Sequence, residues 1–236
     1  MGANIGTTIT AQLIAFKLGD YAFHAIALGA FTYLFSKRKK VQYIGQVLLG
    51  FGLLFLGLET MGDTMAPLEN SAVFVSWMES FAQYPILGVL TGIIVTVAVQ
   101  SSSASFGILL GLVTAGAINY ESAIPILLGS NIGTTVTAIL SAIGANLTAK
   151  RAAAAHFLFN VLGAGIIIAL LYIIPDFSGG LESILLGISN FFGQTGPSTE
   201  RLLANTHTFF NVLTTLIWLP FTAFMVYLVK KIIPGE

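Results

Sequence analysis

A run of four polar side chains, Gln100, Ser101, Ser102 and Ser103, interrupts a long apolar stretch of the sequence. The sequence contains no Lys, Arg, Asp or Glu between residues 79 and 121, so the run lies in a charge-free region. Hydroxyl and amide groups donate hydrogen bonds to an anion and also offer oxygen lone pairs to a cation. At the tip of a helical hairpin, helix-terminal N–H groups would favour an anion further. Serine-mediated helix packing is the structural alternative.

A second polar motif occurs twice, at an offset of 127 residues. Residues 2–11 read GANIGTTITA and residues 129–138 read GSNIGTTVTA, with eight of ten positions identical, which indicates an internal duplication. Its glycines permit either a helix break or a close approach of two backbones. Its amide and hydroxyl oxygens suit hard cations such as sodium, and a small-residue packing seam is the alternative. The candidate ligands are Asn4, Thr7 and Thr8 in the first copy and Asn131, Thr134 and Thr135 in the second.

The composition determines which elements could position these groups. The 236 residues are 56% hydrophobic and 8% charged, which is too little charge to cover a surface that faces water. A soluble enzyme, a disordered chain and a nucleic-acid binder are therefore disfavoured, and no cofactor is expected. Because the apolar runs are continuous, we expect an all-α polytopic membrane protein whose surroundings are the lipid bilayer.

The few charges delimit the expected spans and give their topology. Basic residues at 37–40, 150–151 and 230–231 mark the cytoplasmic side, and the acidic segments 59–83 and 176–198 mark the outside. The C-terminus is therefore expected in the cytoplasm. The expected helices cover 4–16, 21–35, 41–58, 84–99, 104–118, 121–144, 149–174 and 199–229.

The short segments 84–99 and 104–118 suggest a re-entrant hairpin over 84–118 that turns at Gln100 to Ser103, and three full crossings are the competing interpretation. A helix over 121–144 with a break near Gly129 then crosses once. The two copies of the motif consequently point in opposite directions, as in secondary transporters with inverted repeats and broken helices. The expected units are residues 1–58 as the remainder of the first repeat, 59–83 as an extracytoplasmic interfacial connector, 84–229 as the second repeat, and 230–236 as a cytoplasmic tail.

Two further segments resemble one another around a histidine and an asparagine. His156 and Asn160, like His207 and Asn211, lie four residues apart and share a helix face. A polar seam between helices is the favoured interpretation, with a cavity-lining role as the alternative. An intramembrane hydrolase that uses Ser101 and His156 is conceivable, but no nucleophile elbow marks it. Because no charged side chain is expected deep in a span, proton coupling is disfavoured, and an anion would need accompanying cations.

The sequences QSSSAS, PILLGSNIGTTVTAIL, AHFLFNVLG and GANIGTTITAQ resemble the type II sodium-dependent phosphate symporter family over essentially the whole chain. The resemblance implies symport of sodium and inorganic phosphate by alternating access, through two inverted repeats that each carry a QSSS hairpin. It implies that the ten candidate residues line the ion sites, with sodium among Ser101, Ser102, Ser103, Asn131, Thr134 and Thr135. An ion channel and a phosphate sensor on the same scaffold are the alternatives.

The resemblance also implies partners and a location. The counterpart of Gln100 in the first repeat would lie before Met1, so the chain is expected to be an N-terminally truncated fragment that lacks one hairpin, and a hairpin supplied by another chain is the alternative. Bacterial members of the family often continue into a cytoplasmic domain that resembles the phosphate-uptake regulator PhoU. A bacterial member in the cytoplasmic (inner) membrane, with the C-terminus inside, is expected.

Overall fold

The computed structural model describes residues 1–15, 19–65, 67, 70–191 and 198–235, and every regular element there is helical. In chain order the elements are α1 (Gly2–Ile14), η1 (Gly19–Tyr21), α2 (Ala22–Phe35), α3 (Lys39–Met65), α4 (Ala72–Gln83), α5 (Pro85–Val99), α6 (Ser102–Thr114), α7 (Tyr120–Ala142), α8 (Leu147–Ile173), α9 (Phe177–Phe191), α10 (Thr199–Trp218), η3 (Leu219–Phe221) and α11 (Thr222–Ile232). Within the described ranges, four segments are long and apolar enough to cross a membrane: Lys39–Met61, Tyr120–Ala142, Leu147–Ile173 and Thr199–Ile232. The expected all-α membrane fold is confirmed.

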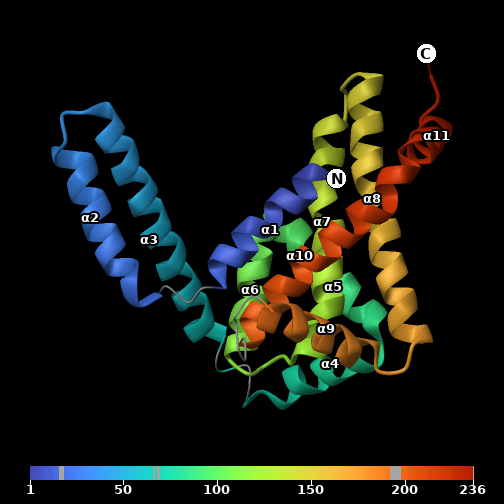
Figure 1. The fold of residues 1–236 in the computed structure, drawn as a ribbon, viewed down its shortest axis with the longest axis horizontal. Helices are drawn as coiled ribbons and strands as arrows, with labels where there is room; N and C mark the ends of the chain where they lie inside the picture. The colour runs from blue at the N-terminus through green and yellow to red at the C-terminus, as the bar shows by residue number, and fades with distance from the viewer. Residues whose placement is uncertain (16–18, 66, 68–69, 192–197, 236) are drawn as a thin grey trace.

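Helix α7 lies at the centre of the packed core. Of the two clusters of buried apolar side chains, one contains Leu127 and the other contains Leu128, so both include α7. Helices α5, α6, α8 and α10 pack around it (Figure 1). The second copy of the duplicated motif therefore lies in the middle of the molecule. The first copy forms α1, which packs beside α10.

The expected break of the 121–144 helix near Gly129 is wrong, because α7 runs through this residue without interruption. The glycine serves close packing instead, since a Cβ on Gly129 would collide with the carbonyl oxygen of Val89 in α5. One turn later, a Cβ on Gly133 would lie 2.8 Å from the Cβ of Thr96. Side chains at these positions would separate two helices whose backbones are in contact.

The helix expected over 199–229 is the one that is interrupted. Helix α10 ends at Trp218, a 3₁₀ turn contains Pro220, and α11 begins at Thr222 and continues to Ile232, into the expected tail. Proline donates no backbone hydrogen bond and its ring clashes with the preceding turn, which accounts for the interruption.

Helices α5 and α6 form a helix–turn–helix at the position of the expected hairpin. Helix α5 ends at Val99, and Gln100 adopts the left-handed conformation with φ 56° and ψ 23°. Ser101 is the N-cap of α6, so Ser102 and Ser103 belong to the first turn of that helix rather than to the turn itself. The re-entrant course of this hairpin through a membrane stays a prediction.

Two segments that were expected to connect spans are largely helical. Helix α3 continues to Met65, so the segment expected over 59–83 begins later, and most of its remainder forms α4. The loop expected over 176–198 contains α9, in which Leu181 and Leu185 are buried one turn apart on one face. Residues 192–197 of that loop lie outside the described residues. Mixed polar and apolar sequence here reflects one-sided burial, and the expectation mistook it for a loop.

Helices α2 and α3 form a hairpin that stands away from most of the core in Figure 1, with the end of α3 packed against α6. The two helices approach closely at glycines. A Cβ on Gly45 would lie 2.6 Å from the backbone nitrogen of Tyr33, and one on Gly52 would lie 2.7 Å from the carbonyl oxygen of Ala22. Small residues at such contacts are typical of helix pairs in membranes.

Candidate functional site

The hairpin tip presents side chains in two different settings. Gln100 is exposed, whereas Ser101, Ser102 and Ser103 are half-buried. The Oγ of Ser101 accepts a hydrogen bond from the backbone N–H of Ala104 at 3.2 Å and so caps α6. Ser102 and Ser103 occupy the first turn, where backbone N–H groups have no partner within the helix. The tip therefore offers hydroxyl and N–H donors together, which suits an anion.

The asparagines and threonines of the two copies match in burial, and the second threonine of each copy makes the same hydroxyl hydrogen bond. Thr8 and Thr135 are both buried, and each donates its hydroxyl hydrogen to the carbonyl three residues earlier in its own helix, at 2.7 Å. Thr134 is half-buried and donates to the carbonyl of Ser130 at 2.9 Å, and Thr7 is half-buried as well. A hydroxyl whose hydrogen is already used presents only lone pairs elsewhere. The three threonine oxygens can therefore act as cation ligands.

The twin asparagines of the motif, Asn4 and Asn131, are both buried and both bond to another helix. Nδ2 of Asn4 donates to Oδ1 of Asn160 in α8 at 2.8 Å. Oδ1 of Asn131 lies 3.0 Å from Nε2 of His207 in α10. Asn160 and Asn211 each donate in turn to the carbonyl of the histidine four residues earlier. The repeated His and Asn pairs thus form the polar seam that the sequence indicated, and the seam joins α8 and α10 to the duplicated motif.

The hydrogen bonds do not link the hairpin tip directly to the twin asparagines. Among the described residues, no hydrogen bond connects the side chains of residues 100–103 with Asn4 or Asn131. The hairpin is instead bonded to the second copy of the motif one helical turn before the tip, where Oγ1 of Thr96 in α5 donates to Oγ of Ser130 at 2.9 Å. Sequence reasoning missed both of these buried residues. Comparison of the two copies did not mark Ser130 as a candidate, because the equivalent residue of the first copy is Ala3.

A second polar network, also missed from the sequence, links α1 to α10. Nη1 of Arg201 donates to Oε1 of Gln12 at 2.8 Å. Nε2 of Gln12 then donates to Oδ1 of Asn205 at 3.1 Å and to Oγ1 of Thr208 at 2.9 Å, and Asn205 donates to Ser189 in α9. The available signal was the position of Gln12, directly after the first copy of the motif.

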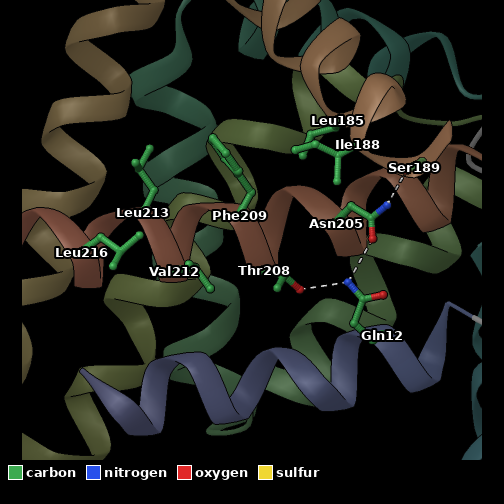
Figure 2. Close-up of a pocket in the computed structure, with 10 residues that line it drawn as sticks. All are labelled: Gln12, Leu185, Ile188, Ser189, Asn205, Thr208, Phe209, Val212, Leu213 and Leu216. Atoms are coloured by element: carbon green, nitrogen blue, oxygen red, sulfur yellow. Dashed lines mark hydrogen bonds between the residues drawn. The ribbon is translucent and has the colours of Figure 1, made fainter. Parts of the chain in front are cut away.

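This network forms the polar end of a pocket of about 420 Å³ (Figure 2). The rest of its wall is apolar, and Leu213 and Leu216 of α10 line the end away from Gln12. The amide groups at the polar end are already hydrogen-bonded to one another. The pocket is therefore an apolar groove rather than the site of the candidate ion ligands.

The charged side chain of Glu200 is buried at the beginning of α10. Glu200 is 6% exposed and lies in the first turn of α10, where Oγ1 of Thr114 donates to its Oε1 at 3.1 Å. A carboxylate in the first turn of a helix is stabilised by the N-terminal end of the helix dipole. The charge still lies at the beginning of a span, as the positions of the charges in the sequence indicated.

The interior also contains buried polar atoms without hydrogen-bond partners among the described residues. These atoms are Ser105 Oγ, Asn131 Nδ2, His207 Nδ1, Asn211 Oδ1, Thr215 Oγ1 and Trp218 Nε1. The His207 ring stacks on Phe106 of α6, with centroids 5.6 Å apart, so this part of the interior brings α6, α7 and α10 together. An unpaired buried donor costs about 1–3 kcal/mol, so such a group requires an explanation.

The chain matches a protein-family model. The sequence model of the family described as Na+/Pi-cotransporter covers residues 1–63 and 69–193. The match includes the hairpin tip, both copies of the duplicated motif and the first His and Asn pair. No solved structure matches the chain.

Individual relatives match over different shares of their length. The chain is 28% identical to "Uncharacterized protein YqeW" of Bacillus subtilis, over all of this chain and 72% of that protein. It is 27% identical to "Putative inorganic phosphate export protein YjbB" of Escherichia coli, over all of this chain but only 41% of the relative. It is also 30% identical to "Sodium-dependent phosphate transport protein 2B" of Pongo abelii, over 81% of this chain and 27% of that protein.

Proposed function

The chain belongs to the Na+/Pi-cotransporter family, and we propose that it moves inorganic phosphate across the bacterial inner membrane together with sodium, by alternating access. The family is one of transporters and not of enzymes. The observation that carries the proposal is the duplicated motif, whose asparagines and second threonines are buried at equivalent positions in α1 and α7. Paired motifs of this kind on inverted repeats are typical of secondary transporters.

The chemistry of these residues favours joint binding of anion and cation. The ten candidate residues are uncharged, so a phosphate bound among them would have no fixed counter-charge. An isolated charge in a low-dielectric interior is costly unless it is paired. Sodium on the threonine oxygens would provide that charge, while N–H and hydroxyl donors at the hairpin tip would hold the anion. Each ion would therefore favour binding of the other.

The direction of net transport follows from the gradients in this proposal. A symporter driven by an inward sodium gradient takes phosphate up. The name of the relative YjbB favours export as the second candidate function. Reversal of the sodium gradient distinguishes the two, because a sodium-coupled carrier reverses with the gradient and an exporter coupled otherwise does not.

The surface of α1 suggests an additional element in the working transporter. Gly2 and Gly6 are the twins of Gly129 and Gly133, yet a Cβ at either position would meet nothing within 4 Å. In α7 the equivalent face is covered by α5. The face of α1 that carries Gly2 and Gly6 is called here the glycine face. We infer that a second hairpin like α5 and α6 covers it. A PhoU-like domain after the basic C-terminal end, in the cytoplasm, is a further proposal from the family resemblance.

The test is phosphate uptake by liposomes that contain the purified transporter, including the inferred second hairpin. An imposed inward sodium gradient should raise the uptake of radiolabelled phosphate well above the uptake in choline, because sodium and phosphate cross together. Accumulation against a phosphate gradient would distinguish a carrier from a channel. Equal uptake in sodium and choline, or no uptake in either, would contradict the proposal.

A further inference from the structure

We propose that the twin asparagines serve ions of opposite charge: Asn131 faces phosphate through its amide nitrogen, and Asn4 faces sodium through its amide oxygen. The inference rests on the proposed function and assigns a ligand to each copy of the duplicated motif. It makes His207 and Asn160 positioning residues, because each one determines which end of its asparagine remains available.

The orientation of Asn4 follows from a chain of obligatory acceptors. The backbone carbonyl of His156 can only accept, so the side chain of Asn160 must direct Nδ2 toward it, as observed at 2.9 Å. Oδ1 of Asn160 then faces Asn4 and can only accept. Asn4 must therefore use Nδ2 for this bond, at 2.8 Å. No hydrogen bond among the described residues uses Oδ1 of Asn4, so the oxygen end remains available.

The orientation of Asn131 is the opposite. Its Oδ1 lies 3.0 Å from Nε2 of His207, and an amide oxygen only accepts, so Nε2 carries the hydrogen. Stacking of the imidazole on Phe106 holds the ring plane. Nδ2 of Asn131 is left without a partner, although the residue is only 5% exposed. Its two N–H groups are donors with no acceptor in the described structure.

The neighbouring groups match these assignments. Thr8 lies one turn after Asn4 on the same face, and its oxygen has lone pairs available because its hydrogen is bonded to Ile5. Ser105 is also buried and without a partner, so its hydroxyl is a second unused donor, on α6, which packs against both α7 and α10. Thr135 lies one turn after Asn131, and its hydroxyl hydrogen is already donated to the carbonyl of Ile132. Its oxygen can only accept or bind a cation, so we assign it to an accompanying cation and not to phosphate.

The available atoms on the Asn131 side are closed to solvent in this structure. Nδ2 of Asn131 and Oγ of Ser105 are both buried without a partner. Phosphate can reach them only after α6, α7 and α10 separate, as alternating access requires. The unpaired donors would then raise the free energy of the closed site without phosphate, and hydrogen bonds to bound phosphate would lower it.

The test measures the two ions separately on the purified chain. Asn131→Leu should weaken the binding of radiolabelled phosphate, at saturating sodium, by about tenfold, the value of one good hydrogen bond. It should leave sodium binding without phosphate unchanged. Asn4→Leu should weaken sodium binding without phosphate by a similar factor. Asn190→Leu, at an exposed asparagine of α9, is the matched control and should change neither.

A second set of variants keeps the test valid where a leucine variant does not fold. Asn131→Asp replaces the N–H donors with a charged oxygen and should abolish phosphate binding. Asn160→Leu removes the acceptor that orients Asn4 and should weaken sodium binding alone. His207→Phe removes the donor that orients Asn131 and should weaken phosphate binding alone, and His207→Gln should restore it. If the Leu variants weaken both ions equally, or in the reverse pattern, the inference is wrong. Failure of the unmodified chain to bind either ion would instead contradict the proposed function.

Discussion

Gly129 in α7 lies directly against the carbonyl group of Val89 in α5, with no room for a Cβ between them. The same backbone contact recurs one turn earlier from the other side, where a Cβ on Gly92 would collide with the carbonyl oxygen of Ile126. The hairpin is therefore held on α7 by close backbone packing, which brings Thr96 within hydrogen-bond distance of Ser130. This contact fixes the hairpin relative to the second copy of the motif.

A methyl group at Gly129 should consequently destabilise the protein. We expect Gly129→Ala to lower the free energy of unfolding by about 1–3 kcal/mol, the usual cost of overpacking a filled contact. Its twin Gly2 has open space, so Gly2→Ala should be neutral or slightly stabilising. Thermal unfolding in detergent compares the two variants. Equal loss of stability in both would show that the contact with Val89 does not distinguish the repeats.

The conformation of Gln100 allows its backbone and side chain to be tested separately. A left-handed residue other than glycine costs about 1–2 kcal/mol, so Gln100→Gly should maintain or raise stability while removing the side chain from the tip. Uptake should fall because the amide is lost. Gln100→Val should lower both stability and uptake, because a β-branched residue is strained at positive φ. Full uptake by folded Gln100→Gly would mean that the side chain takes no part in transport.

The link between Gln12 and Arg201 should contribute to the contact of α1 with α10. A double-mutant cycle with Gln12→Ala and Arg201→Ala should give a coupling energy of about 1 kcal/mol in unfolding, as expected for one charge-assisted hydrogen bond. A parallel cycle with Gln12→Ala and Asn190→Ala should give none. Additive effects of Gln12→Ala and Arg201→Ala would show that this hydrogen bond contributes no net free energy to stability.

The glycine face of α1 gives a prediction that separates folding from transport. Gly6→Leu should not change the thermal stability of the chain, because a Cβ at this position has no neighbour within 4 Å. It should block the packing of a second hairpin on α1 and so abolish phosphate uptake. Unchanged uptake by a stable Gly6→Leu protein would refute the inferred cover.

The helices were largely predictable because the few charged residues delimit the apolar runs. The expected 21–35 helix, for example, coincides with α2 to within one residue. The turn of the hairpin was visible because Gln100 is the first of four polar residues in an apolar region. The duplicated motif was visible because identity at a fixed offset requires no knowledge of contacts.

The roles of individual residues within those helices depend on partners that sequence spacing does not give. A glycine allows both a break and a close contact, and only the presence of Val89 decides between them at Gly129. The partner of Asn131 is 76 residues away in the sequence, so nothing near the motif indicated His207. The twin asparagines looked equivalent in sequence, and only their different partners give them opposite orientations.

The most direct test of the central claim is the effect of each ion on binding of the other. Equilibrium binding of radiolabelled phosphate to the purified chain should tighten about tenfold as sodium replaces choline, and binding of sodium should tighten by the same factor as phosphate is added, because linkage is reciprocal. Phosphate affinity that is equal in sodium and choline would contradict the account.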